Sequence, residues 1–195
     1  MKNKIMCFTS AKGGSGKTVL SASLASLLIA LNKKTLLIDM DAATNGLSLF
    51  YLAELIKAKE TFIAKKIVVR GIFESNAVDL PTPFNIKSGI DLIPAVYEMK
   101  QTDCIFKEEN MRAIVTNTLQ LFKDNYDFII FDTQSGTDIY TKIAIENSDE
   151  VVIVSEYDPI SAEGVERLKN YSPMFYLQKK HGSYLIKFCL SSPHR

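Results

Sequence analysis

The sequence contains little cysteine. Its three cysteines, Cys7, Cys104 and Cys189, stand far apart, and none belongs to a C-x-x-C pair or to a Cys/His pair with metal-ligand spacing. A disulfide framework and a zinc site are therefore both disfavoured. We expect reduced thiols and a cytoplasmic protein.

The chain also lacks an excess of charge and a long hydrophobic segment. Its 22 acidic and 23 basic residues nearly cancel, which leaves only a local basic patch as a surface for nucleic acid or anionic lipid. The longest apolar stretch, residues 19–31, is interrupted by three serines and is shorter than the roughly 20 residues that span a bilayer. It predicts a buried helix and no membrane helix. The apolar run at residues 5–8 is too short for an export signal.

Short β-rich runs alternate with helical patterns along the chain, which is typical of parallel strands joined by crossover helices. We expect residues 1–195 to form one domain, a three-layer, doubly wound α/β fold whose mostly parallel sheet has helices on both faces. Residues 75–87 contain Pro81 and Pro83 and predict a surface connection. The predicted helices cover residues 16–32 and 109–123, and a third begins near Ser161. The predicted strands cover residues 5–9, 35–39, 67–69, 90–93, 128–131, 151–154 and 184–190.

A glycine-rich turn joins the first predicted strand to the first predicted helix, and residues 12–18 read Lys-Gly-Gly-Ser-Gly-Lys-Thr. Glycines let the backbone curl so that successive N–H groups point at phosphate oxygens, and the helix start adds its own N–H groups and dipole. In such a P-loop, Lys17 reaches the β and γ phosphates and the Thr18 hydroxyl ligates Mg²⁺. The general pattern G-x-x-x-x-G-K-[ST] begins with glycine, whereas this chain has Ala11 there, followed by a second lysine, Lys12.

Two further predicted strands end in acidic residues. One delivers Asp39 and Asp41, and the other, which has the form of a Walker B strand, delivers Asp132. Ligands of open α/β sheets bind at the C-terminal ends of the strands, where carboxylates can hold a metal or orient a water. Residues 134–136, Gln-Ser-Gly, then predict a turn whose backbone N–H groups sense the γ phosphate.

These motifs, together with residues 149–154 leading into Asp158 and Pro159, resemble the ParA/MinD family of P-loop ATPases with a deviant Walker A loop, and most closely the ParA-type partitioning ATPases. The resemblance implies ATP and Mg²⁺ as cofactors. It implies catalytic roles for Lys12, which crosses to the partner's phosphates, for Lys17, and for Asp41, which positions the attacking water. The implied metal residues are Thr18, Asp39 and Asp132. The implied nucleotide-binding residues are Lys12, Gly13, Gly14, Ser15, Gly16, Lys17, Thr18 and Val19.

The resemblance also implies partners. ATP is sandwiched in a homodimer, and hydrolysis to ADP and phosphate dismantles that dimer and drives release from DNA. Non-specific DNA and a ParB-like adaptor are the expected partners in plasmid or chromosome partitioning. A DNA-contacting patch could come from Arg70 and four lysines, namely Lys57, Lys59, Lys65 and Lys66.

The chain departs from the family pattern in two places. Val19 stands where a second threonine is common, and the chain stops soon after residues 184–190, where relatives continue through a base-reading asparagine and further helices. We therefore expect a compact or truncated member that lacks the family's C-terminal helices and whose adenine pocket stays undefined.

Other functions on the same scaffold remain open. A MinD-like or flagellar-type membrane positioning ATPase usually ends in a basic amphipathic helix, and an ATP-dependent biosynthetic ligase needs a second substrate pocket. A bacterial tyrosine kinase of the P-loop type usually has a tyrosine-rich tail, and an iron–sulfur reductase needs cysteines after Asp41 or Asp132. The sequence shows none of these tails or cysteines, and His181 and His194 predict surface residues rather than ligands.

Overall fold

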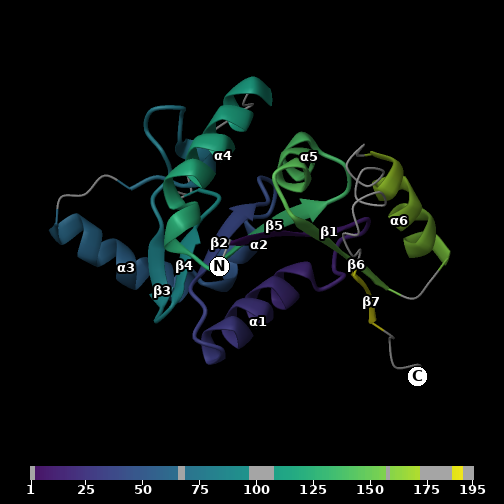
Figure 1. Cartoon of the computed structure of the whole chain (residues 1–195), viewed down its shortest axis with the longest axis horizontal. Coiled ribbons are helices and arrows are strands. Elements are labelled where there is room, and N and C mark those ends of the chain that lie inside the picture. Colours follow the sequence, from purple (N-terminus) through teal and green to yellow (C-terminus); the bar gives the residue numbers. More distant parts are fainter. Residues whose placement is uncertain (1–2, 66–68, 97–107, 157–158, 172–185, 191–195) are drawn as a thin grey trace.

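The computed structural model describes residues 3–65, 69–96, 108–156, 159–171 and 186–190, and of residues 169–171 and 186–190 it describes the backbone. Within these residues one sheet has the strand order β3-β4-β2-β5-β1-β6-β7 (Figure 1). All neighbouring strands run parallel except β3 and β4. The strands are β1 (Lys4–Ser10), β2 (Thr35–Met40), β3 (Phe84–Lys87), β4 (Ile90–Ile93), β5 (Phe128–Ser135), β6 (Glu150–Glu156) and β7 (Ile186–Leu190).

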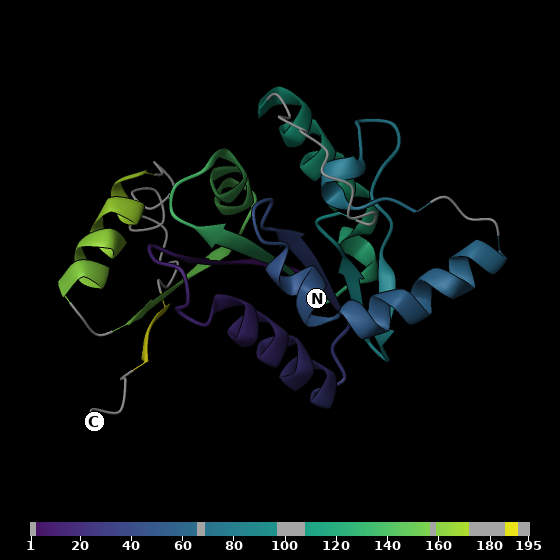
Figure 2. The same cartoon turned by 180° about the vertical axis from the view of Figure 1, so that it is seen from behind.

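Helices cover both faces of this sheet, as both views show (Figures 1 and 2). One face packs against α1 (Lys17–Ala30), α2 (Gly46–Phe50) and α3 (Leu52–Ala64), and the other against α4 (Glu108–Phe122), α5 (Ile139–Glu146) and α6 (Pro159–Tyr171). Two short 3-10 helices lie at Ile72–Glu74 and Lys123–Asn125. The predicted three-layer α/β fold is confirmed, with a mostly parallel sheet between two helical layers.

The central strands are apolar on both sides, which explains why they form the interior. On β2, Leu36 and Ile38 face the core under α4 and α5, whereas Leu37 faces the core under α1. Small residues on α1, Ala22 and Ala25, let that helix lie close to the sheet. The first helix therefore holds the glycine-rich loop tightly against the strand ends.

Several predictions of local structure were wrong or incomplete. Residues 75–87 are not only a connection, because β3 occupies the last four of them and pairs with β4. The turn predicted at residues 134–136 is shorter, since β5 continues through Ser135 and only Gly136 adopts a positive φ, of 99°. Helices α2, α3 and α5 were not predicted. Residues 67, 68, 184 and 185 of two predicted strands, and Cys104, Asp158, His181 and His194, lie outside the described residues, and Val69 belongs to no strand.

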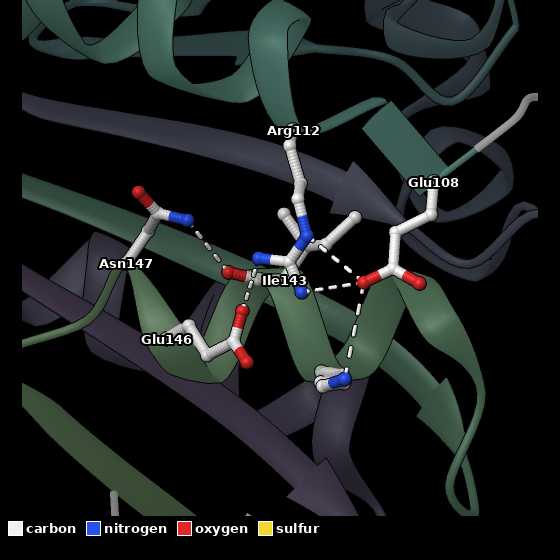
Figure 3. Close-up of polar contacts among 6 residues, drawn as sticks. Glu108, Arg112, Ile143, Glu146 and Asn147 are labelled. Carbon is white, nitrogen blue, oxygen red and sulfur yellow. Dashed lines mark hydrogen bonds and ion pairs between the residues drawn. The ribbon is translucent and has the colours of Figure 1, made fainter. Parts of the chain in front are cut away.

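An ion cluster joins α4 to α5 (Figure 3). The guanidinium of Arg112 on α4 donates to Glu108 Oε1 at 2.7 and 2.9 Å and also to Glu146 on α5. Lys142 Nζ of α5 lies 3.8 Å from Glu108 Oε1. Because these side chains are exposed or partly exposed, each pair contributes little to stability. The cluster nevertheless links α5 to α4, and α5 is the helix that follows the loop after β5.

Candidate nucleotide site

The loop between β1 and α1 has the backbone shape that a phosphate cradle requires. Gly14 and Gly16 have φ of 78° and 88°, a region that strains any residue with a side chain. Gly16 is also the residue from which α1 begins, so the free N–H groups of the first helical turn lie at the same place. Ser15, between the two glycines, is buried, and its Oγ has no hydrogen-bond partner among the described residues.

A cavity of about 510 Å³ opens in front of this loop, a volume within the usual range for small-molecule sites. It lies at the C-terminal ends of β1, β2 and β5, the three central strands. Its lining comes from three segments that are far apart in the sequence: Gly13, Gly14, Lys17 and Thr18; Asp41, Ala43 and Thr44; and Gln134 and Ser135. The glycine loop, the end of β2 and the end of β5 thus form one site.

Thr18 and Asp132 form a hydroxyl–carboxylate pair at the base of this site. Thr18 Oγ1 donates to Asp132 Oδ2 at 2.8 Å, and Ser21 Oγ donates to Asp132 Oδ1 at 3.2 Å. Burial raises the pKa of Asp132 to about 6, although Thr18, Lys17 and Ser21 pull that pKa down. The pair offers hard oxygen ligands of the kind that Mg²⁺ prefers.

Lys17 points into the cavity from the first turn of α1. Its Nζ donates to Ser135 Oγ at 3.0 Å, across from the loop. Burial lowers the pKa of Lys17, and the nearby charges of Asp132 and Asp41 oppose that shift. The ammonium is therefore partly desolvated, which strengthens its attraction for an anion entering the cavity.

Asp41 organises the loop that follows β2. Its Oδ1 accepts from the backbone N–H of Ala43 at 3.0 Å and of Thr44 at 2.8 Å, and its Oδ2 accepts from Thr44 Oγ1 at 2.5 Å. The carboxylate therefore has a fixed orientation at the rim of the cavity. The sequence spacing Asp-x-x-Thr could have indicated this local cap.

Asp39 lies behind the cavity rather than in its lining. It is fully buried, and its Oδ2 accepts from the backbone N–H of Ser48 at 2.8 Å and from Ser48 Oγ at 2.6 Å. Its Oδ1 accepts from the backbone N–H of Asp41 at 3.0 Å. Burial raises its pKa to about 7. In this structure Asp39 anchors α2 and orients Asp41, and its predicted place in the metal shell stays a prediction.

Lys12 and Val19 lie at the edges of the predicted nucleotide set. Lys12 Nζ makes a surface ion pair with Glu156 Oε2 at 3.0 Å, and its side chain is half-exposed. The Val19 side chain is exposed. Neither residue lines the cavity in this structure.

The residues present fit a magnesium nucleotide. The loop supplies backbone donors and a buried hydroxyl without a partner, and Lys17 supplies a cation. In the described part of the chain no three acidic, histidine or cysteine side chains gather into a metal site. Mg²⁺ is usually held by one or two carboxylates together with substrate phosphates, and Asp132 supplies such a carboxylate beside the Thr18 hydroxyl.

Sequence reasoning missed several hydroxyl groups that complete the site. Ser21 could have been found, because it stands three residues after Thr18 on the same face of a helix. Ser48 and the side chains of Ser10 and Ser135 carried no recognisable spacing signal. Their contacts depend on how the strands pair.

The buried carboxyls predict a pH dependence for the metal-free protein. Both folded pKa values, about 6 for Asp132 and about 7 for Asp39, exceed the ordinary value of 3.8, so the folded state binds more protons than the unfolded state. The free energy of unfolding should therefore fall as pH rises from about 4 to about 7, with a loss on the order of 2 to 4 kcal/mol between pH 5 and 8. Urea unfolding at a series of pH values measures this.

The variant Asp132→Asn provides the control for that series. Both side-chain partners of Asp132 are hydroxyls, which can accept as well as donate, so the amide oxygen can accept from one of them and the amide nitrogen can donate to the other. We expect a flatter profile for the variant. A wild-type stability that rises between pH 5 and 8 would contradict the assignment of raised pKa values.

Three comparisons with known proteins agree with this geometry. A family model described as an AAA domain matches residues 3–182. The sporulation initiation inhibitor protein Soj of Bacillus subtilis is 29% identical over 86% of this chain and 64% of its own length. The septum site-determining protein MinD of Synechocystis sp. is 29% identical over 85% of this chain and 58% of its own length. This chain thus spans less than two thirds of these relatives.

A solved structure extends the comparison. A putative plasmid partition protein from Borrelia burgdorferi, bound to AMPPNP, superposes with a TM-score of 0.65 at 26% identity. The match covers 98% of this chain and 76% of that one.

Proposed function

Because this chain belongs to the ParA/MinD family of P-loop ATPases, we propose that it is an ATP-dependent, dimerising ATPase of the plasmid or chromosome partitioning type. It hydrolyses ATP to ADP and phosphate, and hydrolysis drives its release from DNA. The observation that carries this proposal is the convergence of Lys17, Thr18 and Asp41 on one cavity in front of the glycine loop.

The residues in and beside the cavity have the following proposed roles. The loop N–H groups and Lys17 bind and orient the phosphates, and Thr18 with Asp132 would hold Mg²⁺, which would neutralise phosphate charge. Asp41, fixed by its contacts to Ala43 and Thr44, orients the attacking water and accepts its proton. Asp39 supports Asp41 from behind.

In the proposed dimer Lys12 has a function, although it does not line the cavity of its own chain. Its half-exposed position beside the loop suits a group that reaches the phosphates of a partner subunit. A lysine supplied in this way stabilises the charge that develops during phosphoryl transfer, as an arginine finger does. The active unit is then a homodimer with ATP between the subunits.

The proposed partners are non-specific DNA and a ParB-like adaptor, and the proposed location is the cytoplasm. Among the described residues of the predicted patch, Lys57, Lys59 and Lys65 lie on or just after α3, whereas Arg70 Nη1 lies 3.7 Å from Asp79 Oδ1. Lys66 lies outside the described residues. No helix in the described part of the chain is both long and apolar enough to cross a bilayer.

Nucleotide binding gives the first test. We expect Lys17→Ala to weaken ATP binding by about 100-fold, because the cavity loses the cation that meets the phosphates. Fluorescence titration with a labelled ATP analogue and Mg²⁺ measures this. The control is Lys87→Ala on the exposed side of β3, which should bind like the wild type. Equal binding by the Lys17 variant would refute the proposed site.

DNA and lipid distinguish the partitioning function from the MinD-like alternative. Sedimentation with plasmid DNA or with anionic vesicles is measured in ATP and in ADP. The partitioning proposal expects retention by DNA in ATP and release in ADP. Equal retention by DNA in ATP and in ADP contradicts the partitioning proposal. ATP-dependent retention by vesicles favours the membrane positioning ATPase.

A further inference from the structure

We propose that the Ser135 side chain distinguishes ATP from ADP by donating its hydroxyl to the terminal phosphate. This proposal deepens the proposed ATPase function and rests on it. The γ-phosphate sensing expected from the sequence concerned only backbone N–H groups of residues 134–136. The structure adds a side-chain hydroxyl held in a specific hydrogen-bonded chain.

The chain of hydrogen bonds starts at Lys17 and ends at the first residue of the glycine loop. Lys17 Nζ donates to Ser135 Oγ at 3.0 Å, Ser135 Oγ lies 3.2 Å from Ser10 Oγ, and Ser10 Oγ donates to the Lys12 carbonyl at 2.9 Å. Ser10 has one hydroxyl proton and two neighbouring acceptors, and the Lys12 carbonyl is the nearer one and can only accept. With the proton of Ser10 on that carbonyl, the Ser135 hydroxyl donates to Ser10.

This arrangement changes when an anion meets Lys17. A phosphate oxygen that accepts from Lys17 Nζ lies within reach of Ser135 Oγ as well, because the two atoms are only 3.0 Å apart. The Ser135 hydroxyl can then rotate from Ser10 to the phosphate oxygen, where a hydrogen bond to a charged acceptor is stronger than one to a neutral hydroxyl. Ser135 thus exchanges a weak acceptor for a strong one.

The position of Ser135 in the cavity indicates which phosphate group its hydroxyl contacts. In a P-loop the backbone N–H groups cradle the inner phosphates, whereas the lysine reaches the last two. Gly13 and Gly14 line the loop side of the cavity, and Ser135 approaches Lys17 from β5, the other side. A Cβ placed on Gly13 would lie 3.9 Å from Ser135 Oγ, an ordinary van der Waals contact, so the hydroxyl lies at the edge of the loop beside Lys17. Its contact with Lys17 therefore assigns Ser135 to the outermost phosphate that this lysine reaches.

The backbone couples this contact to Lys12. The Gly136 N–H donates to the Ser10 carbonyl at 2.8 Å, and Ser10 pairs with Ser135 after a register shift in β1. When the Ser135 hydroxyl turns to the phosphate, Ser10 Oγ still donates to the Lys12 carbonyl but no longer accepts a hydrogen bond from Ser135. The presence of the terminal phosphate is in this way transmitted to the residue that dimerisation uses.

The test compares two nucleotides on Ser135→Ala and Ser135→Thr. Dissociation constants for AMPPNP and for ADP are measured by calorimetry with Mg²⁺, and thermal unfolding establishes that each variant is folded. For Ser135→Ala we expect about tenfold weaker AMPPNP binding, because one hydrogen bond to a charged group is lost, and ADP binding within about twofold of the wild type. Ser135→Thr keeps the hydroxyl and should keep the wild-type ratio.

Two further variants separate this role from general damage to the loop. Ser10→Ala removes the competing acceptor but keeps the Ser135 hydroxyl, so the preference for AMPPNP should be retained or increased. Ser23→Ala, on the exposed side of α1, should change neither constant. Equal weakening of both nucleotides by Ser135→Ala, or no weakening, overturns the inference. Binding of neither nucleotide by the wild type overturns the ATPase proposal itself, and the inference with it.

Discussion

Asp41→Asn is expected to slow ATP turnover by at least about 100-fold while the protein still binds ATP and forms its ATP-dependent dimer. Asparagine keeps an oxygen for the backbone N–H groups of Ala43 and Thr44, and its amide can donate to the Thr44 hydroxyl. The loop after β2 is therefore preserved, and only the charged proton acceptor is lost. Single-turnover kinetics and gel filtration in ATP measure the two effects.

Asp138 provides a matched control for that variant. It caps α5 with the same set of contacts, accepting from the backbone N–H groups of Tyr140 and Thr141 and from the Thr141 hydroxyl. Asp138→Asn should change stability about as much as Asp41→Asn and leave turnover within about twofold of the wild type. If both variants lose turnover equally, Asp41 acts only through the local fold.

Lys12→Ala is expected to reduce turnover by about 1,000-fold and to leave the protein monomeric in ATP. The reason is that the proposed lysine reaches the partner's phosphates, so its loss removes both a contact between subunits and a charge at the reacting group. ATP binding by the monomer should persist, since Lys12 does not line its own cavity. Analytical ultracentrifugation and steady-state turnover measure the result.

Lys4→Ala is the corresponding control. Lys4 begins β1 and Lys12 follows the other end of that strand, and each makes an ion pair with a glutamate of β6, Glu150 or Glu156. Removing Lys4 therefore deletes an equivalent ion pair far from the cavity. Undiminished turnover in the Lys12 variant would exclude a sandwiched dimer.

The sequence predicted the central strands well and the edge strand β3 poorly. The interior strands are apolar on consecutive residues, because helices cover both faces, and this pattern is easily recognised. At the edge, β3 has Phe84 and Ile86 buried but Asn85 and Lys87 exposed, and it directly follows two prolines. Four residues of alternation are too few to outweigh the turn signals beside them.

Helix α3 was missed for a related reason. None of its residues is fully buried, so its inward side chains, such as Leu55 and Phe62, give only a weak contrast with exposed Ile56 and Ile63. A periodic pattern predicts a helix only where one face is clearly apolar. Here both faces carry large hydrophobic residues.

Some residues of the candidate site can likewise be predicted from the sequence, and others cannot. The loop and the three acids stand in motifs with fixed spacing, and the structure brings the loop, Asp41 and Asp132 together. The Ser10 and Ser135 hydroxyls are 125 positions apart in the chain and meet only because β1 pairs with β5. No local pattern contains that information. Likewise, the turn of the Asp39 carboxylate toward Ser48 depends on where α2 packs.

The strand order also has a consequence for how the protein is made. The first two strands to leave the ribosome, β1 and β2, do not pair with each other, because β5 lies between them. The glycine loop and Asp41 are therefore translated long before the strand that joins them, which is not complete until residue 135. Such long-range pairing forms slowly, and the nascent chain carries exposed strand edges until then. Nucleotide can therefore bind and stabilise the domain only late in synthesis, after β5 has paired with β1 and β2.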